Sequence, residues 1–128
     1  MRILALALSA IVFLSTPLSA IAGDAEAGAE AFKKKTCKAC HTVEQGGKNR
    51  VGPNLFGIVG AAAGQVEGFK YSDALMAKSS EGLTWNAENL QEWLENPKGF
   101  IDGTKMKLKL KKQEDRDNII AYLETLKE

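Results

Sequence analysis

The sequence predicts an all-α fold in a single domain, with three main helices and one or two short ones. Apolar residues recur three and four positions apart in the segments 24–35, 84–95 and 114–127, which is the period of one face of a helix. No strand pattern surrounds the two cysteines, and no regular period persists through the glycine-rich stretch 42–68. We therefore expect helices joined by long looped segments that something other than a sheet must organise.

The first predicted helix runs from Ala25 to Lys35. Asp24 is its N-cap candidate, and Glu26 lies in the first turn, where negative charge suits the helix dipole. Gly28 lies inside this helix, where glycine costs about 1 kcal/mol relative to alanine. Its presence suggests close packing against another backbone.

The remaining helices follow from caps and stop signals. Ser72 and Thr84 each precede a helical segment as cap candidates. Asn96-Pro97 should end the middle helix, because proline pushes the preceding residue out of the helical region, and the stretch 98–112 should be irregular. The predicted ranges are Ser72–Lys78, Thr84–Glu95 and Glu114–Lys127.

The first 22 residues have the three parts of a secretory signal peptide. A positive start at Met1-Arg2 leads into an apolar run from Ile3 to Leu14, and Ala20-Ile21-Ala22 provides a cleavage site. The run is short for a membrane span, which needs about 20 residues, although an uncleaved anchor is the alternative. We expect a signal peptide at 1–22 and one mature domain at 23–128.

The mature chain is electrically balanced. Loss of Arg2 leaves sixteen basic and sixteen acidic side chains. A net charge of zero gives no support to a role in nucleic-acid binding. At this length the chain builds only a modest core.

Cys37-Lys38-Ala39-Cys40-His41 is the motif on which the functional interpretation depends. C-x-x-C-H is the haem c attachment signature. Each thiol can add to one vinyl group of haem, and the imidazole that follows can then bind the iron from below the porphyrin. The chain contains two cysteines and one histidine, and all three lie in this motif.

Other interpretations of the cysteine pair are weaker. A structural zinc site needs four nitrogen or sulfur ligands, and Cys37, Cys40 and His41 offer only three. A thioredoxin-like redox pair needs a βαβ context. An ordinary short-loop disulfide with an incidental histidine is the remaining alternative.

Eight segments of the mature chain together resemble the class I c-type cytochromes, close to mitochondrial cytochrome c and bacterial cytochrome c2. The resemblance covers the whole mature chain. The segments that carry it are Gly23-Asp24, Cys37 to Val43, Gly52-Pro53-Asn54-Leu55, Gly68-Phe69-Lys70-Tyr71, Leu83-Thr84-Trp85, Asn96-Pro97-Lys98, Gly103-Thr104-Lys105-Met106 and Ile120-Ala121-Tyr122-Leu123.

The resemblance implies an all-helical fold wrapped around one covalent haem, held through Cys37 and Cys40 with His41 and Met106 as axial ligands. It implies that the first and last helices cross, with Gly28 and Phe32 meeting Tyr122 and Leu123. It also implies roles around the haem for five further residues, namely Pro53 as the acceptor for the histidine ring, Tyr71, Trp85 and Thr104 at the propionates, and Trp93 near the methionine. For each aromatic residue the alternative is plain core packing.

The choice of Met106 over Met76 also follows from the residues themselves. Met76 sits beside Leu75 in a helical segment, so we expect it in the core, the usual place for methionine. Met106 lies in an irregular stretch among lysines, where a buried anchor suggests a ligand. With histidine and methionine on the iron, no site stays open for substrate, which favours electron transfer over catalysis.

Three positions depart from the family pattern. The stretch 58–64 lacks the arginine that the family often places near a propionate, and the asparagine expected after Tyr-x-Asp-Ala is Leu75. Lys107-Leu108-Lys109-Leu110 replaces the usual aromatic residue and glycine after Met106. These changes bear on redox tuning and on the partner surface.

Lysines gather around the predicted ligand Met106, at Lys105, Lys107, Lys109 and Lys111, and Lys38 lies inside the haem motif. A solvated face is the ordinary explanation for such a run. The functional explanation is a positive surface that steers the protein onto an acidic partner and allows rapid release.

We therefore expect a soluble periplasmic one-electron carrier, not an enzyme, that binds haem c and works as a monomer. Its partners would be redox proteins met by transient electrostatic docking: a quinol–cytochrome c oxidoreductase, a terminal oxidase, a photosynthetic reaction centre or a periplasmic dehydrogenase. The alternatives are a haem enzyme or sensor with a labile methionine ligand, and a dedicated subunit of one oxidoreductase.

Overall fold

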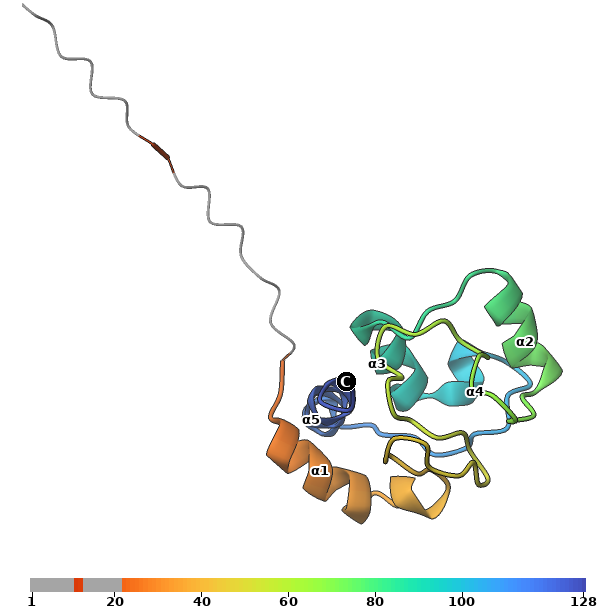
Figure 1. Ribbon diagram of the computed structural model, residues 1–128, viewed down its shortest axis with the longest axis horizontal. Helices are drawn as coiled ribbons and strands as arrows, with labels where there is room; N and C mark the ends of the chain where they lie inside the picture. Colours follow the sequence, from red (N-terminus) through yellow and green to blue (C-terminus); the bar gives the residue numbers. More distant parts are fainter. Residues whose placement is uncertain (1–10, 13–21) are drawn as a thin grey trace, which may run out of the picture.

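The computed structural model describes residues 11–12 and 22–128, so most of the predicted signal peptide lies outside the described residues. Five α-helices and one 3₁₀ turn are present in the described part (Figure 1), which confirms the all-α prediction. The only β-type pairing among these residues is a single antiparallel bridge between Ala62 and Thr84. The elements are α1 (Ala25–Lys34), η1 (Cys37–Ala39), α2 (Asp73–Ser80), α3 (Ala87–Glu95), α4 (Pro97–Phe100) and α5 (Gln113–Glu124).

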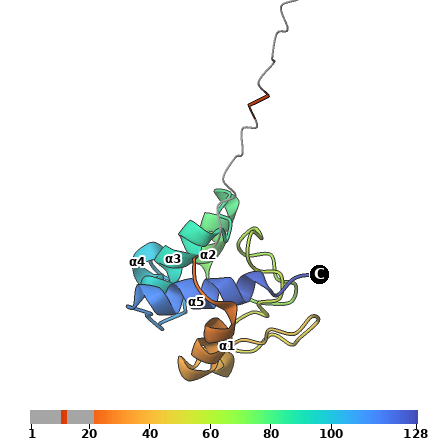
Figure 2. The same ribbon diagram turned by 90° about the vertical axis from the view of Figure 1, so that its left-hand side faces the viewer.

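Helices α1 and α5 cross, and this is the most extensive contact between helices. In Figures 1 and 2, α1 lies on one side of α5, and α2, α3 and α4 lie on the other. Gly28 makes the crossing possible, because a Cβ there would lie only 1.8 Å from the carbonyl oxygen of Asn118. Phe32 and Tyr122 add an edge-to-face contact with ring centroids 5.7 Å apart. The close backbone approach expected at Gly28 is confirmed.

The predicted starts of α1 and α2 are confirmed, whereas that of α3 is wrong. Asp24 caps α1 by accepting from the Ala27 N–H, and Ser72 caps α2 by accepting from the Leu75 N–H. Helix α3 begins at Ala87, where Asn86 is the cap. Thr84 is instead held in the bridge to Ala62. The helix therefore starts after Asn86, the next residue along the chain that is well suited to cap it.

Two further boundaries differ from the prediction. Pro97 ends α3 as expected but also begins α4, since proline suits the first position of a helix and Asn96 caps it through the Gly99 N–H. Helix α5 ends at Glu124, three residues before Lys127. Within the described part, no helix has the length and apolar character needed to cross a bilayer.

The core lies between the α1–α5 crossing and α2, α3 and α4, and the loops 41–71 and 101–112 close around it. Leu75 is buried, but the neighbouring Met76 is 40% exposed. The prediction that Met76 belongs to the core is therefore wrong: α2 has one buried position, and Leu75 occupies it. Met106 is half-buried, and it is the methionine that faces the interior.

Candidate functional site

A cavity of about 470 Å³ opens into the core between the loops, large enough for a sizeable organic group. Apolar side chains from α1, α3 and α5 form its floor, among them Phe32, Leu94 and Ile119. The structure brings together at this cavity every residue for which a haem-binding role was predicted. These residues are Cys37, Cys40, His41, Pro53, Tyr71, Trp85, Thr104 and Met106.

The cysteines and the histidine are set by the turn η1 and the residue after it. The amides of Cys40 and His41 both donate to the carbonyl of Cys37, at 3.2 and 3.0 Å. This tight turn puts both thiols and the imidazole on the cavity wall. Thr36 enters it with φ 63°, a left-handed conformation that is uncommon for a β-branched residue.

The two thiols have different environments. Both are free, and Cys37 is buried whereas Cys40 is half-buried. Burial raises the pKa of the Cys37 thiol to about 11, because a thiolate is disfavoured in an apolar environment. In the folded chain Cys37 is therefore protonated at neutral pH and a weak nucleophile.

His41 is fixed from two sides. Its Nδ1 lies 2.7 Å from the carbonyl oxygen of Pro53, and since a carbonyl only accepts, Nδ1 carries the proton in this bond. Gly52 packs on the ring: a Cβ there would lie 2.2 Å from Cε1 of His41. Burial lowers the pKa of His41, so the imidazole is neutral and its Nε2 lone pair is available to a metal.

Met106 reaches the cavity from an extended segment. Burial alternates along residues 104–110: Thr104, Met106, Leu108 and Leu110 face inward, and the intervening lysines are exposed. This alternation presents the Met106 thioether to the same cavity as His41. A thioether and a neutral imidazole are the protein ligands found together on the haem iron of c-type cytochromes.

The polar aromatic residues line the same cavity. Tyr71 accepts from the Val66 N–H at 3.0 Å through its hydroxyl oxygen, which leaves the hydroxyl hydrogen able to donate elsewhere. Burial raises the pKa of Tyr71, so it stays protonated. Trp85 packs against Trp93 with ring centroids 5.2 Å apart. Thr104 is 5% exposed.

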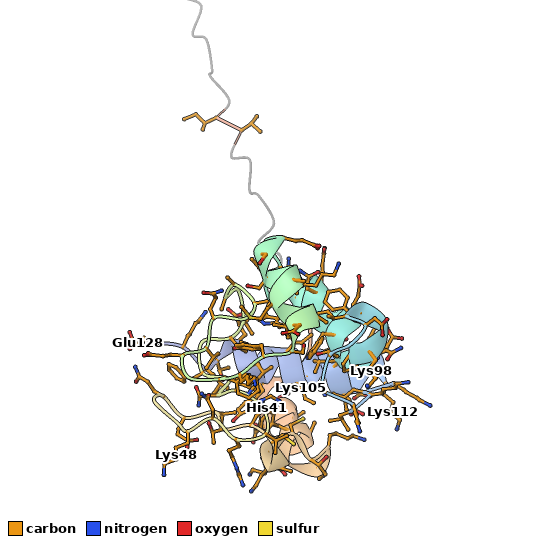
Figure 3. All side chains as sticks on the ribbon, turned by 90° about the vertical axis from the view of Figure 1, so that its right-hand side faces the viewer. His41, Lys48, Lys98, Lys105, Lys112 and Glu128 are labelled. Carbon is orange, nitrogen blue, oxygen red and sulfur yellow. The ribbon has the colours of Figure 1, made fainter. Side chains whose placement is uncertain are left out.

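All five lysines of the predicted docking surface are exposed. Lys105 and Lys107 line the mouth of the cavity. Lys105 and His41 both line this cavity and are labelled near the centre of the face drawn in Figure 3, with Lys112 toward its edge. Lys105 also donates to the carbonyl of Lys70 at 3.2 Å, so it ties two loops together in addition to carrying charge.

Two residues near the site had no predicted role. Gly52 lies in the segment Gly52-Pro53-Asn54-Leu55, which carries part of the family resemblance. Its contact with the His41 ring, however, depends on tertiary packing that no local pattern encodes. Arg116 is buried in α5, and a charged residue in an amphipathic helix ordinarily predicts an exposed position.

The residues present fit a haem. The cavity combines an apolar floor with two free thiols at its wall, one imidazole whose second nitrogen is unengaged, and one thioether. A planar apolar group bearing two reactive vinyl carbons and a metal centre matches this set of donors. The geometry thus defines an all-α protein whose cavity suits one cofactor attached through its two thiols.

The comparisons with known proteins agree with that definition. The family model for cytochrome c matches residues 25–127. Cytochrome c of Stellaria longipes is 50% identical over 103 residues, which cover 80% of this chain and 92% of that protein. Cytochrome c2 of Rhodospirillum rubrum is 43% identical over 113 residues, 82% of this chain and 99% of that protein.

A solved structure, that of cytochrome cH from Methylobacterium extorquens, superimposes with a TM-score of 0.71 at 48% identity, covering 80% of this chain and 99% of that one. The chain belongs to the cytochrome c family. Its cofactor is haem c, bound covalently through Cys37 and Cys40, and the family is one of electron carriers.

Proposed function

We propose that this chain is a periplasmic one-electron carrier in which His41 and Met106 are the axial ligands of haem c. The observation that carries the proposal is the meeting of these two side chains at one cavity, from separate segments, beside both cysteines. When bound, the haem supplies a redox centre whose iron changes between ferrous and ferric states.

The protein's own residues set the conditions for that chemistry. The Pro53 carbonyl holds the His41 ring in one tautomer and orientation. The Met106 thioether is a soft, neutral donor that favours ferrous iron and so raises the potential. The apolar floor keeps water away, and we assign Tyr71, Trp85 and Thr104 to the polar edge of the cofactor.

The ligand assignment is tested by replacing each methionine in turn. Met106→Ala should change the visible spectra of both oxidation states, lower the midpoint potential and open the iron to added ligands. Met76→Ala is the matched control, since Met76 lies on the outer face of α2 and should leave every spectrum unchanged. Unchanged spectra in Met106→Ala would instead favour a haem enzyme or sensor with a different sixth ligand.

The same proposal includes export and cleavage after Ala22. Gly23 supports this boundary: Ala22 is exposed, whereas a Cβ on Gly23 would lie 2.4 Å from the carbonyl oxygen of Asp117. This packing supports the proposal that the mature domain begins at Gly23. Mass spectrometry of the purified holoprotein should give a chain that starts there and carries one haem. A chain that keeps Met1 would instead support an uncleaved anchor.

The proposed partners are membrane-bound or periplasmic redox complexes with acidic docking faces. Lys38, Lys105, Lys107, Lys109 and Lys111 support this part of the proposal, because all five are exposed. Gel filtration of the native periplasmic extract separates a free carrier from a dedicated subunit, since a free carrier should elute as a small monomer.

A further inference from the structure

Arg116 is a charged side chain in the core of the domain. It lies in α5 and is only 7% exposed. Arginine is rarely buried unless it is paired, yet none of the ion pairs within the described residues includes it. Hydrogen bonds must therefore compensate for the cost of burying its charge.

The guanidinium group binds the end of the segment that carries Met106. Its Nη1 donates to the carbonyl oxygens of Leu110 and Lys111, at 2.7 and 2.9 Å. The Leu110 N–H in turn donates to Leu94 in α3 at 2.8 Å. The start of the segment is held by a separate hydrogen bond, in which the Thr104 N–H donates to the carbonyl of Ile101 at 3.2 Å. Met106 thus lies on a short span fixed at both ends.

A glutamine orients the guanidinium and links it to a negative charge. Nε of Arg116 donates to Oε1 of Gln91 at 2.9 Å, and Nε2 of Gln91 donates to Oδ1 of Asp117 at 2.5 Å. An amide is suited to this place because it accepts from the cation and donates to the carboxylate at once. The arrangement uses the fixed fork of arginine, which a lysine cannot reproduce.

We propose that Arg116 is a positioning residue for Met106: by holding Leu110 and Lys111 it keeps the thioether on the iron against competing ligands. This inference rests on the proposed function, in which Met106 is the sixth ligand. A competing ligand must displace Met106, and its apparent affinity scales with the fraction of protein in which the span has moved away. Loosening one end of the span raises that fraction.

The test is a titration of the ferric holoprotein with imidazole, comparing wild type with Arg116→Lys. We expect the apparent affinity for imidazole to rise at least tenfold, which corresponds to about 1.4 kcal/mol. The sulfur-to-iron charge-transfer absorption should weaken. The midpoint potential should fall although the positive charge is kept, because ferrous iron loses its preferred thioether.

The matched control is Ile120→Val in the same helix. Ile120 is 1% exposed and is absent from the cavity lining, and this change costs roughly 0.5–1.5 kcal/mol of overall stability. Its imidazole affinity and potential should stay at wild-type values. An equal rise in both variants would overturn the proposal, since general destabilisation would then explain the effect.

Gln91→Met is a second, milder variant, which decides the matter if Arg116→Lys does not bind haem. It removes one acceptor of the guanidinium and should raise the imidazole affinity two- to fivefold. An imidazole affinity equal to that of the wild type in Arg116→Lys would overturn the role of Arg116. If Arg116→Lys does not bind haem, the same result in Gln91→Met would overturn it. The underlying ligand assignment fails separately, through unchanged spectra in Met106→Ala.

Discussion

His41 shows how two consecutive residues, Gly52 and Pro53, produce one usable ligand. Gly52 lets the backbone lie against the imidazole ring, and Pro53 follows at once with the carbonyl that receives Nδ1–H. The Gly52 amide also donates to the Cys40 carbonyl at 2.8 Å, which ties this turn to the attachment motif. The histidine is therefore neutral and held in one orientation.

Stability should consequently depend on pH in the range where histidine titrates. Burial lowers the folded-state pKa of His41, and a haem iron at Nε2 would exclude the proton as well. Below the ordinary pKa of about 6.5, an unfolded chain that has released the iron therefore binds a proton that the native chain does not. The free energy of unfolding should be constant above pH 7 and fall by up to about 1.4 kcal/mol per pH unit below pH 6.

Urea unfolding from pH 7.5 to 5.5 measures this directly. The chain contains one histidine, so no other side chain has its ordinary pKa in that interval. A free energy of unfolding that stays flat across it would contradict the prediction and indicate that the imidazole remains bound to iron in the unfolded chain.

The contact between α1 and α5 depends on the absence of one methyl group. At Gly28 the nearest atoms to an added Cβ belong to the Asn118 backbone and to Tyr122, and a backbone cannot move aside as a flexible side chain can. Asp24 reinforces the crossing, since its N–H donates to the Asn118 side chain at 2.9 Å.

Gly28→Ala should therefore destabilise the holoprotein by roughly 3 kcal/mol or more, at the upper end of what overpacking costs. The gain in helix propensity, about 1 kcal/mol, is too small to offset the clash. Gly46→Ala is the control: an added Cβ there meets nothing within 4 Å, so only its positive φ adds strain. Thermal unfolding followed by visible absorbance compares the two, and equal losses would contradict the packing argument.

Local signals predicted the helices well and their boundaries less well. Asp24 and Ser72 cap the helices expected of them, because each side-chain oxygen accepts from the backbone N–H three residues further on. Thr84 is drawn into a bridge with Ala62, and Asn86 caps α3 instead. The dual role of Pro97 as the end of one helix and the start of the next needed the geometry of the Asn96 cap.

The attachment part of the site was predictable from local sequence, because Cys37, Cys40 and His41 lie within one short motif. The attachment motif itself contains the residues that bind the cofactor. The family resemblance predicted Pro53, Tyr71 and Trp85 as further site residues. The burial of Arg116 and the exposure of Met76 were not predictable, since each depends on which face of its helix meets the rest of the domain. The local sequence around neither residue indicates which face of its helix is buried.

The charge of the molecule is unevenly distributed although its sum is small. Exposed lysines alternate with inward-facing Met106 and Leu108 along the segment at the cavity mouth. Exposed carboxylates lie on α3 and at the start of α5, including Glu88, Glu92 and Glu114. Positive charge should therefore be concentrated at the cavity mouth, where Lys105 and Lys107 lie.

Electron transfer with an acidic membrane-bound oxidoreductase should accordingly slow as salt rises, because the Debye length is only about 10 Å at 0.1 M. Lys107→Glu with Lys109→Glu should reduce the second-order rate at low salt by at least tenfold, as expected when steering is lost, and leave the midpoint potential nearly unchanged.

Lys78→Glu together with Lys127→Glu is the control for those substitutions. It reverses two exposed charges that already pair with Glu81 and Glu124 and that do not line the cofactor cavity. Stopped-flow rates should distinguish the two double variants. A rate indifferent to salt and equal in both would remove the docking surface from the proposed function without touching the ligands.

In the export proposed above, the crossing of the first and last helices would set an order of events. Asp24 and Asn118 are 94 positions apart, so this contact cannot form until nearly the whole chain has emerged from the translocation channel. Until then the thiol of Cys37 lacks the burial that raises its pKa to about 11 in the closed domain. A more exposed thiol forms its thiolate more readily, so the proposed export would favour thioether formation before the domain closes.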